Sequence, residues 1–380
     1  MKFIHTADWH IGRQFHNVSL LDDQRHVLDQ LVVYIEQEAV DALVIAGDIY
    51  DRSVPPSKAV ELLDEFINKI CSDMKVPVIM IPGNHDGAER LRFGSRQLSL
   101  AGLHILGDLR KVAEPVILSC ETGEVAFYGI PYNDPETVRN LFAEDVASYD
   151  EAHTYLVDQI KGVKRDDIPS VLISHCFLNG AEESESERPL SIGGADRVSY
   201  GPCTDFDYVA LGHLHSPQYK GQEHIRYSGS ILKYSFSEQN QKKGITLVEM
   251  DTKGLVAIKH LPLVPLRDMR IVEDDIETIL EQGTVDPNAD DYLLVRLTDR
   301  HAILDPMSKL RAVYPNVLHL EKPGMLETGE QQMKRETLKR GELEMFRDFF
   351  LQITGQAIKE EQDEAVQKAI IELNKQRTEA

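Results

Sequence analysis

The chain has 380 residues, 42% hydrophobic and 27% charged, which is typical of a folded protein of two or three domains with a sizeable core. No apolar run reaches the length of roughly 18 residues that spans a bilayer, and MKFIHTADWH lacks the apolar core of a signal peptide. The four cysteines show no CxxC spacing. We therefore expect a cytoplasmic protein with reduced thiols. The formal net charge of −22 argues against a protein that coats nucleic acid through bulk electrostatics alone, because phosphate contacts need clustered Lys and Arg.

Five short segments rich in Val, Ile or Leu are typical of buried strands that end in polar residues. They span residues 3–7, 42–48, 76–84, 171–175 and 208–213. Between the second and the third, SKAVELLDEFINKI (57–70) carries apolar residues at helical spacing behind two prolines, which predicts a helix. This alternation indicates an α/β sandwich whose polar strand ends gather at one edge, where open α/β sheets place their ligand sites.

A second part of the chain follows LPLVPL (261–266), whose prolines suggest a linker. Strand-like and helix-like segments alternate from there to residue 323, which is enough for a small α/β domain. The remaining residues are highly charged and carry apolar residues at helical spacing, so we expect a helical tail. The predicted parts are therefore 1–262, 266–323 and 327–380.

Every predicted strand ends on residues that could hold a metal ion. In chain order these are Asp8 and His10, Asp48 and Asp51, Asn84 with His85 and Asp86, His175, and His213 with His215. Two divalent ions about 3.5–4 Å apart need several ligands and one shared carboxylate, and Asp48 is the natural bridge. Imidazole, carboxylate and amide oxygen together suit Mn, Fe or Zn better than Ca or Mg.

Each member of this set is weak evidence when taken alone. A single histidine such as His175 is more often structural than a ligand, and Asp51 and Asp86 could equally be carboxylates that cap loops. The whole series, with each member placed after a strand, is hard to obtain by accident. The sequence therefore predicts a dinuclear metal site.

The series D-x-H, GDxxD, GNHD, H and GHxH resembles that of the calcineurin-like metallophosphoesterases. The intervening residues are similar to the bacterial SbcD nuclease subunits, over nearly all of residues 1–240. The stretches that carry this similarity are HTADWHIG (5–12), GDIYDRSVPPSKA (47–59), PGNHDGAERL (82–91), FDYVALGHLHSPQ (206–218) and YSGSILKYSFSE (227–238). The resemblance implies a four-layer metallophosphoesterase β-sandwich flanked by helices, a small α/β capping domain that binds DNA, and a helical C-terminal tail.

The resemblance also implies how the site is assembled around two divalent ions, typically Mn²⁺. One ion would be held by Asp8, His10, Asp48 and His215, and the other by Asp48, Asn84, His175 and His213. His85 matches the family's catalytic histidine, which would orient the phosphate or protonate the leaving oxygen. Asp51 and Asp86 would fix the tautomers of the histidines or the geometry of the loops. The implied activity is an ATP-dependent 3′–5′ double-strand exonuclease and single-strand endonuclease that processes DNA ends and hairpins in repair and replication.

Three kinds of partner follow from the same resemblance. We expect no association with a membrane. The tail 327–380 would bind a coiled-coil ATPase of the SbcC type, although its apolar stripe could instead pack on its own domain. Helices near 57–70 and 89–100 would form a homodimer, or they merely cover the sheet. The third partner is DNA, in a nucleoid-associated location. An ATPase could supply the basic surface that this acidic chain lacks.

Contacts with DNA are the least constrained expectation. Candidates near the ligand motifs are Arg13, His16, Arg52, Arg90 and Arg92, although an arginine in such a place is often only a solvated surface residue. Trp9 could stack on a base or pack against the sheet. Two competing functions remain open from the sequence: a metallophosphoesterase that acts on small substrates, and a scaffold that keeps the fold without catalysis.

Overall fold

The computed structural model describes residues 1–322 except 122, 188–195 and 300, and scattered residues between 346 and 368. The chain forms two compact units, Met1–Asp268 and Met269–Ala380. The predicted helical tail, 327–380, lies outside the described residues apart from those scattered positions.

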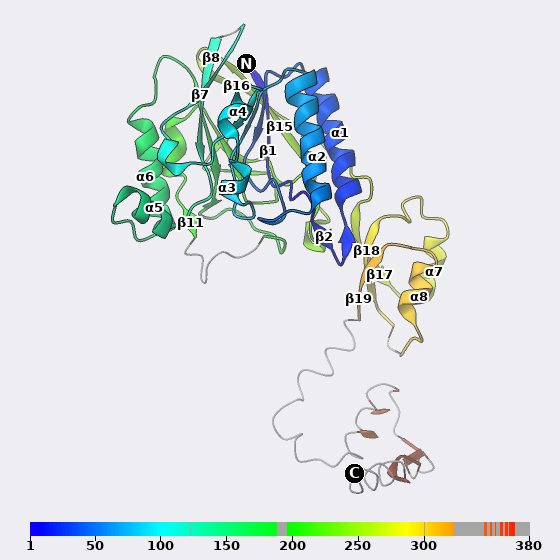
Figure 1. Ribbon diagram of the computed structural model, residues 1–380. Helices are drawn as coiled ribbons and strands as arrows, with labels where there is room; N and C mark the ends of the chain where they lie inside the picture. Colours follow the sequence, from blue (N-terminus) through cyan, green and yellow to red (C-terminus); the bar gives the residue numbers. More distant parts are fainter. Residues whose placement is uncertain are drawn as a thin grey trace. The chain divides into compact units, whose positions relative to one another are not determined.

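Two six-stranded sheets form the first unit (Figure 1). The first sheet has the order β16-β15-β1-β4-β5-β6, with β1 at Lys2–Thr6, β4 at Ala42–Ile45, β5 at Val78–Met80, β6 at Leu103–Ile105, β15 at Gly244–Asp251 and β16 at Gly254–Pro262. The second has the order β13-β14-β12-β9-β8-β7, with β7 at Val116–Cys120, β8 at Gly123–Ile130, β9 at Ser170–His175, β12 at Tyr208–Gly212, β13 at Gln218–Lys220 and β14 at Gln222–Tyr227. Two short pairs accompany them, β2 (Gln14–Phe15) with β3 (Val18–Ser19) and β10 (Phe177–Leu178) with β11 (Arg197–Val198). The mixed α/β class predicted from the sequence is confirmed.

The main core lies between the two sheets. One buried cluster takes Phe3 and Val44 from the first sheet and Phe127, Ile173 and Tyr208 from the second. The ring of Phe3 packs edge-on against Phe127 and Tyr208, with ring centroids 5.4 Å and 5.6 Å apart. Such aromatic contacts across a sandwich bury a large apolar area. The sheets therefore pack face to face, which brings their strand ends together.

Helices cover the outer faces of the sandwich (Figure 1). They are α1 (Leu21–Gln37) and α2 (Ser57–Ile67) beside the first sheet, and α5 (Pro135–Phe142) and α6 (Tyr149–Lys161) beside the second. The buried face of α6 shares a cluster with Leu172 and Val209 of the second sheet. Ser148 caps α6, because its hydroxyl accepts a hydrogen bond from the backbone N–H of Glu151 at 3.2 Å.

The structure refines the bounds of two expected helical segments. The helix expected over 57–70 ends at Ile67 and continues as a π-helical segment, Asn68–Asp73. The segment 89–100 is not one helix but two short ones, α3 (Ala88–Leu91) and α4 (Ser95–Ser99). Gly94 separates them with φ +73, a conformation that a continuous right-handed helix cannot contain.

The second unit contains a small parallel sheet with two helices. The order β17-β18-β19 is built from β17 (Met269–Asp274), α7 (Ile276–Gly283), β18 (Tyr292–Leu297), α8 (Pro306–Arg311) and β19 (Val317–Glu321). Its core packs Ile279 and Leu310 of the helices against Val295 of the central strand. Among the residues that the structure describes, no helix is long and apolar enough to cross a membrane.

The buried His153 makes the stability of the first unit depend on pH. Its Nε2 lies 2.9 Å from Ser174 Oγ, and burial lowers its pKa from 6.5 to about 4. As pH falls below 6.5, the unfolded chain binds a proton that the folded chain does not, so the free energy of unfolding falls by about 1.4 kcal/mol per pH unit until about pH 4. We expect His153→Gln to make this fall shallower by about that slope between pH 6.5 and 5 in urea unfolding. An unchanged slope would contradict this expectation.

Candidate metal centre

The ends of five strands from both sheets meet at one site. In the first sheet, β1, β4 and β5 run parallel and end level, because Thr6 pairs with Ile45 and Ile45 with Met80. In the second, Gly212 at the end of β12 pairs with His175 at the end of β9. The loops and strand ends at these positions carry all seven predicted ligands, each of them wholly or largely buried: Asp8, His10, Asp48, Asn84, His175, His213 and His215.

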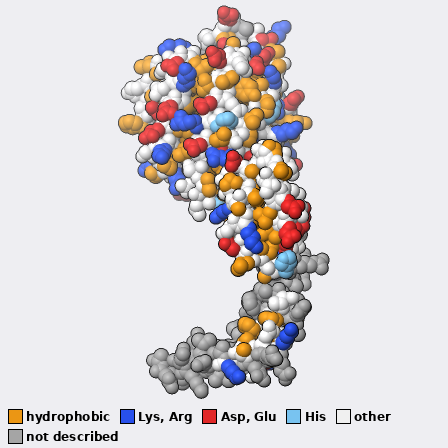
Figure 2. All heavy atoms as spheres, turned by 90° about the vertical axis from the view of Figure 1, so that its right-hand side faces the viewer, with side chains coloured by type: hydrophobic (Ala, Val, Ile, Leu, Met, Phe, Trp, Pro, Cys, Tyr) orange, Lys and Arg blue, Asp and Glu red, His pale blue; other side chains and the backbone are white. Residues whose placement is uncertain are grey.

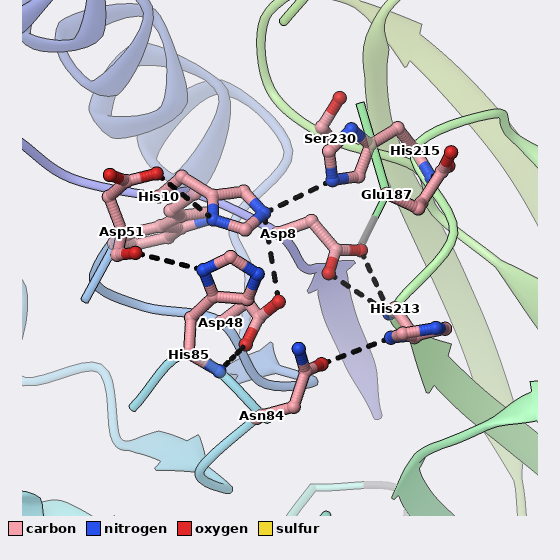
Figure 3. Close-up of polar contacts among 12 residues, drawn as sticks. Asp8, His10, Asp48, Asp51, Asn84, His85, Glu187, His213, His215 and Ser230 are labelled. Carbon is pink, nitrogen blue, oxygen red and sulfur yellow. Dashed lines mark hydrogen bonds and ion pairs between the residues drawn. The ribbon is translucent and has the colours of Figure 1, made fainter. Parts of the chain in front are cut away.

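Side chains from both sheets converge at this site (Figure 3). They form two groups, His10 with His215, and Asn84 with His175 and His213. The Nε2 atoms of His10 and His215 are 3.1 Å apart. Asp48 lies between the groups: its Oδ2 is 3.7 Å from His10 Nε2 and 3.6 Å from His175 Nε2. The Asp48 carboxylate thus lies between the two groups, within reach of both.

The Asn84 amide joins the second group. Its Oδ1 is 3.0 Å from His175 Nε2 and 3.1 Å from His213 Nδ1. The other ring nitrogen of His175, Nδ1, donates to the backbone carbonyl of Ala46 at 2.8 Å. A carbonyl only accepts, so this bond leaves the Nε2 lone pair of His175 free to bind an ion.

The backbone at this site adopts conformations that are unfavourable for residues other than glycine. Asp8, His10, Asp48 and His213 have φ values of 53, 44, 49 and 108. Each such residue costs on the order of 1–3 kcal/mol, and the strain persists only where surrounding structure enforces it. Here the backbone N–H of His213 donates to Asp8 Oδ1 at 2.9 Å, which holds the two sheets together at the strained positions.

Glycines permit this close approach of the strand ends. A Cβ on Gly47 would lie 2.2 Å from His175 Nδ1, and one on Gly83 would lie 2.2 Å from Asp48 Oδ1. A Cβ on Gly212 would lie 1.9 Å from the carbonyl oxygen of Ala46. The strand ends can therefore approach this closely only because these three positions lack a side chain.

Gly212→Ala should destabilise the first unit, because the added Cβ meets backbone that cannot move without parting the sheets. We expect the free energy of unfolding to fall by at least about 1–3 kcal/mol, the usual cost of overpacking. Urea unfolding of Gly201→Ala is the matched control, since a Cβ there meets nothing within 4 Å. Equal midpoints for the two variants would contradict the explanation.

The electrostatics of the buried donors fit a pair of divalent cations. Burial and the neighbouring Asp48 raise the pKa of Asp8 well above its usual range. Burial and the other histidines lower the pKa of His10 well below its usual value and that of His213 to about 3. The His10 and His213 rings are therefore neutral with available lone pairs, and the close carboxylates of Asp8 and Asp48 are stabilised by added positive charge. The buried Nδ1 of His10 has no hydrogen-bond partner among the described residues.

His85 lies at the edge of the group with a defined orientation. It is 8% exposed, and its ring packs edge-on against His10 with centroids 4.7 Å apart. Its Nδ1 donates to the backbone carbonyl of Asp51 at 2.8 Å, and its backbone N–H donates to Asp48 Oδ1 at 2.9 Å. Nε2 is left as the atom that can exchange a proton or hydrogen-bond a bound phosphate.

Asp51 and Asp86 surround the donors in different ways. Asp51 Oδ1 lies 3.8 Å from His10 Nδ1 and 3.4 Å from Arg13 Nη1. Asp86 accepts backbone N–H groups of Ile49, Tyr50 and Gly83 at 3.1, 2.9 and 2.9 Å. Asp86 therefore fastens the loop after β4 to the loop after β5, so it has the loop-capping contacts that the sequence left as an alternative.

Several residues at the site were missed by sequence reasoning. Glu187 Oε1 accepts the backbone N–H of His215 at 2.7 Å, and Ser186 Oγ lies 2.6 Å from His215 Nδ1. Gln24 Nε2 donates to the carbonyl of His10 at 2.7 Å. Glu238 and Lys243 form a buried ion pair close by. For Glu238 the available signal was the stretch 227–238, which carried the family resemblance without an assigned role.

The candidate DNA contacts occupy varied surroundings. The guanidinium of Arg13 lies 4.9 Å above the Tyr234 ring and pairs with Asp51, whereas Arg52 is more exposed and lies 3.7 Å from the same carboxylate. Arg90 donates to the carbonyl of Ser53 at 3.2 Å. His16 packs against Phe15 and Phe236, and Arg92 pairs with Asp108 at 3.0 Å. Trp9 is fully buried against Phe66 and so cannot stack on a base.

Comparison with known proteins decides the family. A model of the calcineurin-like phosphoesterases matches residues 1–217. The SbcD chain of the SbcCD nuclease from Staphylococcus epidermidis is 36% identical over 367 residues, which cover 96% of this chain and 97% of that protein. The chain belongs to the SbcD family of calcineurin-like phosphoesterases. Membership makes it a phosphodiester hydrolase of the nuclease class, with a metallophosphoesterase fold and residues suited to a dimetal site.

A second family model covers a further part of the chain. A model described as the type 5 capsule protein repressor C-terminal domain matches residues 265–354. Among solved structures, TT1561 of Thermus thermophilus is 13% identical with a TM-score of 0.39, covering 68% of this chain and 98% of that one. A dimetal phosphatase from Danio rerio is 12% identical with a TM-score of 0.41, covering 70% and 99%.

Proposed function

We propose that this chain is a Mn²⁺-dependent DNA nuclease subunit that works with an SbcC-type coiled-coil ATPase. In that complex it would act as an ATP-dependent 3′–5′ double-strand exonuclease and single-strand endonuclease on DNA ends and hairpins. The observation that carries the proposal is the buried convergence of four imidazoles, two carboxylates and one amide around Asp48. The relative from Staphylococcus epidermidis is named as one subunit of the SbcCD nuclease, which supports the pairing with an ATPase.

The proposed roles follow the contacts at the site. Asp8, His10, Asp48 and His215 would hold one ion, and Asp48, Asn84, His175 and His213 the other. Two divalent ions lower the pKa of bound water and offset charge on phosphoryl oxygens. The donor mixture suits Mn²⁺. His85, held through Nδ1, would present Nε2 to orient the phosphate or protonate the leaving oxygen.

The charge distribution supports a partner that helps to hold DNA. Figure 2 shows Lys and Arg interspersed with Asp and Glu on the face in view, without a continuous basic stripe among the described residues of that face. Arg13, Arg52 and Arg90 near the site, and the small domain 266–323, are our candidates for contacts with the phosphate backbone. An ATPase with a basic surface, bound through the tail 327–380, would supply the remaining attraction.

The proposed homodimer would form through α2 and the α3–α4 segment. These elements line a largely apolar hollow of about 500 Å³ that includes Val60, Leu63 and Leu98. Beside it, Phe93 and Leu100 are 86% and 90% exposed. Exposed apolar side chains next to an apolar hollow are typical of an interface. A monomeric mass for the purified chain in light scattering would contradict this assembly.

The proposed activity is tested with one preparation and two substrates. The purified chain is incubated with Mn²⁺ and either hairpin and linear DNA or a chromogenic phosphodiester, with and without the ATPase and ATP. We expect DNA cleavage that requires Mn²⁺, stops with EDTA and increases with the ATPase and ATP. Cleavage of the small ester alone would favour a phosphoesterase of small substrates, and no hydrolysis of either would favour a scaffold.

A further inference from the structure

A buried ion pair lies behind His215. Glu238 ends the 3₁₀ segment Phe236–Glu238 and is fully buried, and its Oε2 is 2.5 Å from Nζ of Lys243, which is 6% exposed. Burial opposes ionisation of Glu238, and the adjacent Lys243 ammonium favours it. Burying two charges is costly and often adds no stability. The pair therefore indicates a role other than stabilising the folded chain.

The carboxylate end of the pair lies beside His215, with Glu238 Oε1 3.5 Å from His215 Nδ1, and Ser186 bridges the two side chains. The Ser186 hydroxyl is hydrogen-bonded to Glu238 Oε1 and lies 2.6 Å from His215 Nδ1. An ionised carboxylate only accepts, so the hydroxyl donates to Glu238 and its oxygen accepts the proton on Nδ1. With its proton on Nδ1, the His215 ring presents the lone pair of Nε2, the atom that faces His10 Nε2 at 3.1 Å.

The ammonium end of the pair holds the main chain of the same histidine. Lys243 Nζ donates to the backbone carbonyl of His215 at 2.8 Å and to Ser230 Oγ at 2.8 Å. Both the ring and the backbone of His215 are therefore fixed by one buried pair. In metal sites, a carboxylate behind a histidine commonly sets the ring tautomer and orientation.

We propose that Glu238 is a positioning residue of the metal centre, acting through Ser186 to hold His215 with the Nε2 lone pair directed at an ion. The inference rests on the proposed dinuclear site and deepens it. Loss of such outer partners typically lowers metal affinity by about 10–100-fold. The ion held by His215 should be affected, and the ion held by His175 and His213 should not.

The experiment measures Mn²⁺ binding by the metal-free full chain, with free Mn²⁺ quantified by electron paramagnetic resonance. We expect two ions in the parent chain. Ser186→Ala and Glu238→Gln should each lower the affinity for one Mn²⁺ ion by about 10–100-fold and leave the affinity for the other unchanged. Ser186→Thr keeps the hydroxyl and should bind both ions with the affinity of the parent chain. Asp291→Asn is the control, because it neutralises a carboxylate 2.6 Å from Arg270 in the second unit.

The outcomes separate this inference from the proposed function. A parent chain that binds no pair of ions would refute the proposed function. If Ser186→Ala binds both ions as tightly as the parent chain does, the positioning role alone is overturned, and a failure of Ser186→Thr to restore affinity would overturn it as well. If Glu238→Gln does not fold because Lys243 is left unpaired, the Ser186 variants decide, since they change no charge.

Discussion

Asp48→Asn should lower DNA cleavage by the Mn²⁺-loaded chain by about 10³-fold or more. Its Oδ2 faces His10 and His175 at 3.7 and 3.6 Å, so one carboxylate serves both proposed ion sites. The neutral amide has the same size, but it cannot offset the repulsion between two divalent ions. Each 1.4 kcal/mol of lost charge stabilisation lowers the rate about tenfold, so a loss of several kcal/mol accounts for the expected decrease.

Two measurements on Asp48→Asn check this expectation. Single-turnover cleavage of a labelled hairpin gives the rate, and paramagnetic resonance gives the number of bound Mn²⁺ ions, which should fall below that of the parent. The backbone N–H of His85 still finds an acceptor in the Asn amide oxygen, so urea unfolding should change little. Cleavage within tenfold of the parent at saturating Mn²⁺ would refute Asp48 as the bridge.

His85→Ala should lower cleavage by about 10²–10⁴-fold while both ions remain bound. This is the usual range for loss of a general acid or base. His85 is oriented by the Asp51 carbonyl, and its Nε2 is left for the substrate. His10, Asp51 and His85 also lie close enough to hold an ion by themselves, which gives a distinct alternative.

Mn²⁺ titration distinguishes these two roles of His85. Unchanged binding of two ions with a large loss of rate supports catalysis, and loss of an ion would make His85 a ligand. His104→Ala is a suitable control, since His104 is a half-buried histidine on β6, outside the proposed donor set. Equal cleavage by His85→Ala and the parent would refute the catalytic assignment.

The strand ends show what local sequence could and could not predict. Short apolar segments that end on D-x-H, GDxxD, GNHD and GHxH predicted strands and donors together, because buried parallel strands and ligand chemistry both leave local patterns. Long-range pairing leaves weaker ones. The sequence did not predict strands β15 and β16, because buried and exposed residues do not alternate regularly along them. Nor did it predict that the segment 89–100 is broken into two helices.

The chain's sequence by itself determined the fold class and the family, and it predicted which residues are the donors. Those properties depend on residue types at fixed spacing. Only the tertiary structure decided that the donors come from two sheets, that Asp86 fastens two loops, and that Ser186, Glu238 and Lys243 support His215. Such contacts join residues that can be more than 200 positions apart, as in Asp8 with His213. Packing of the whole sandwich, and not any local pattern, brings them within hydrogen-bonding distance.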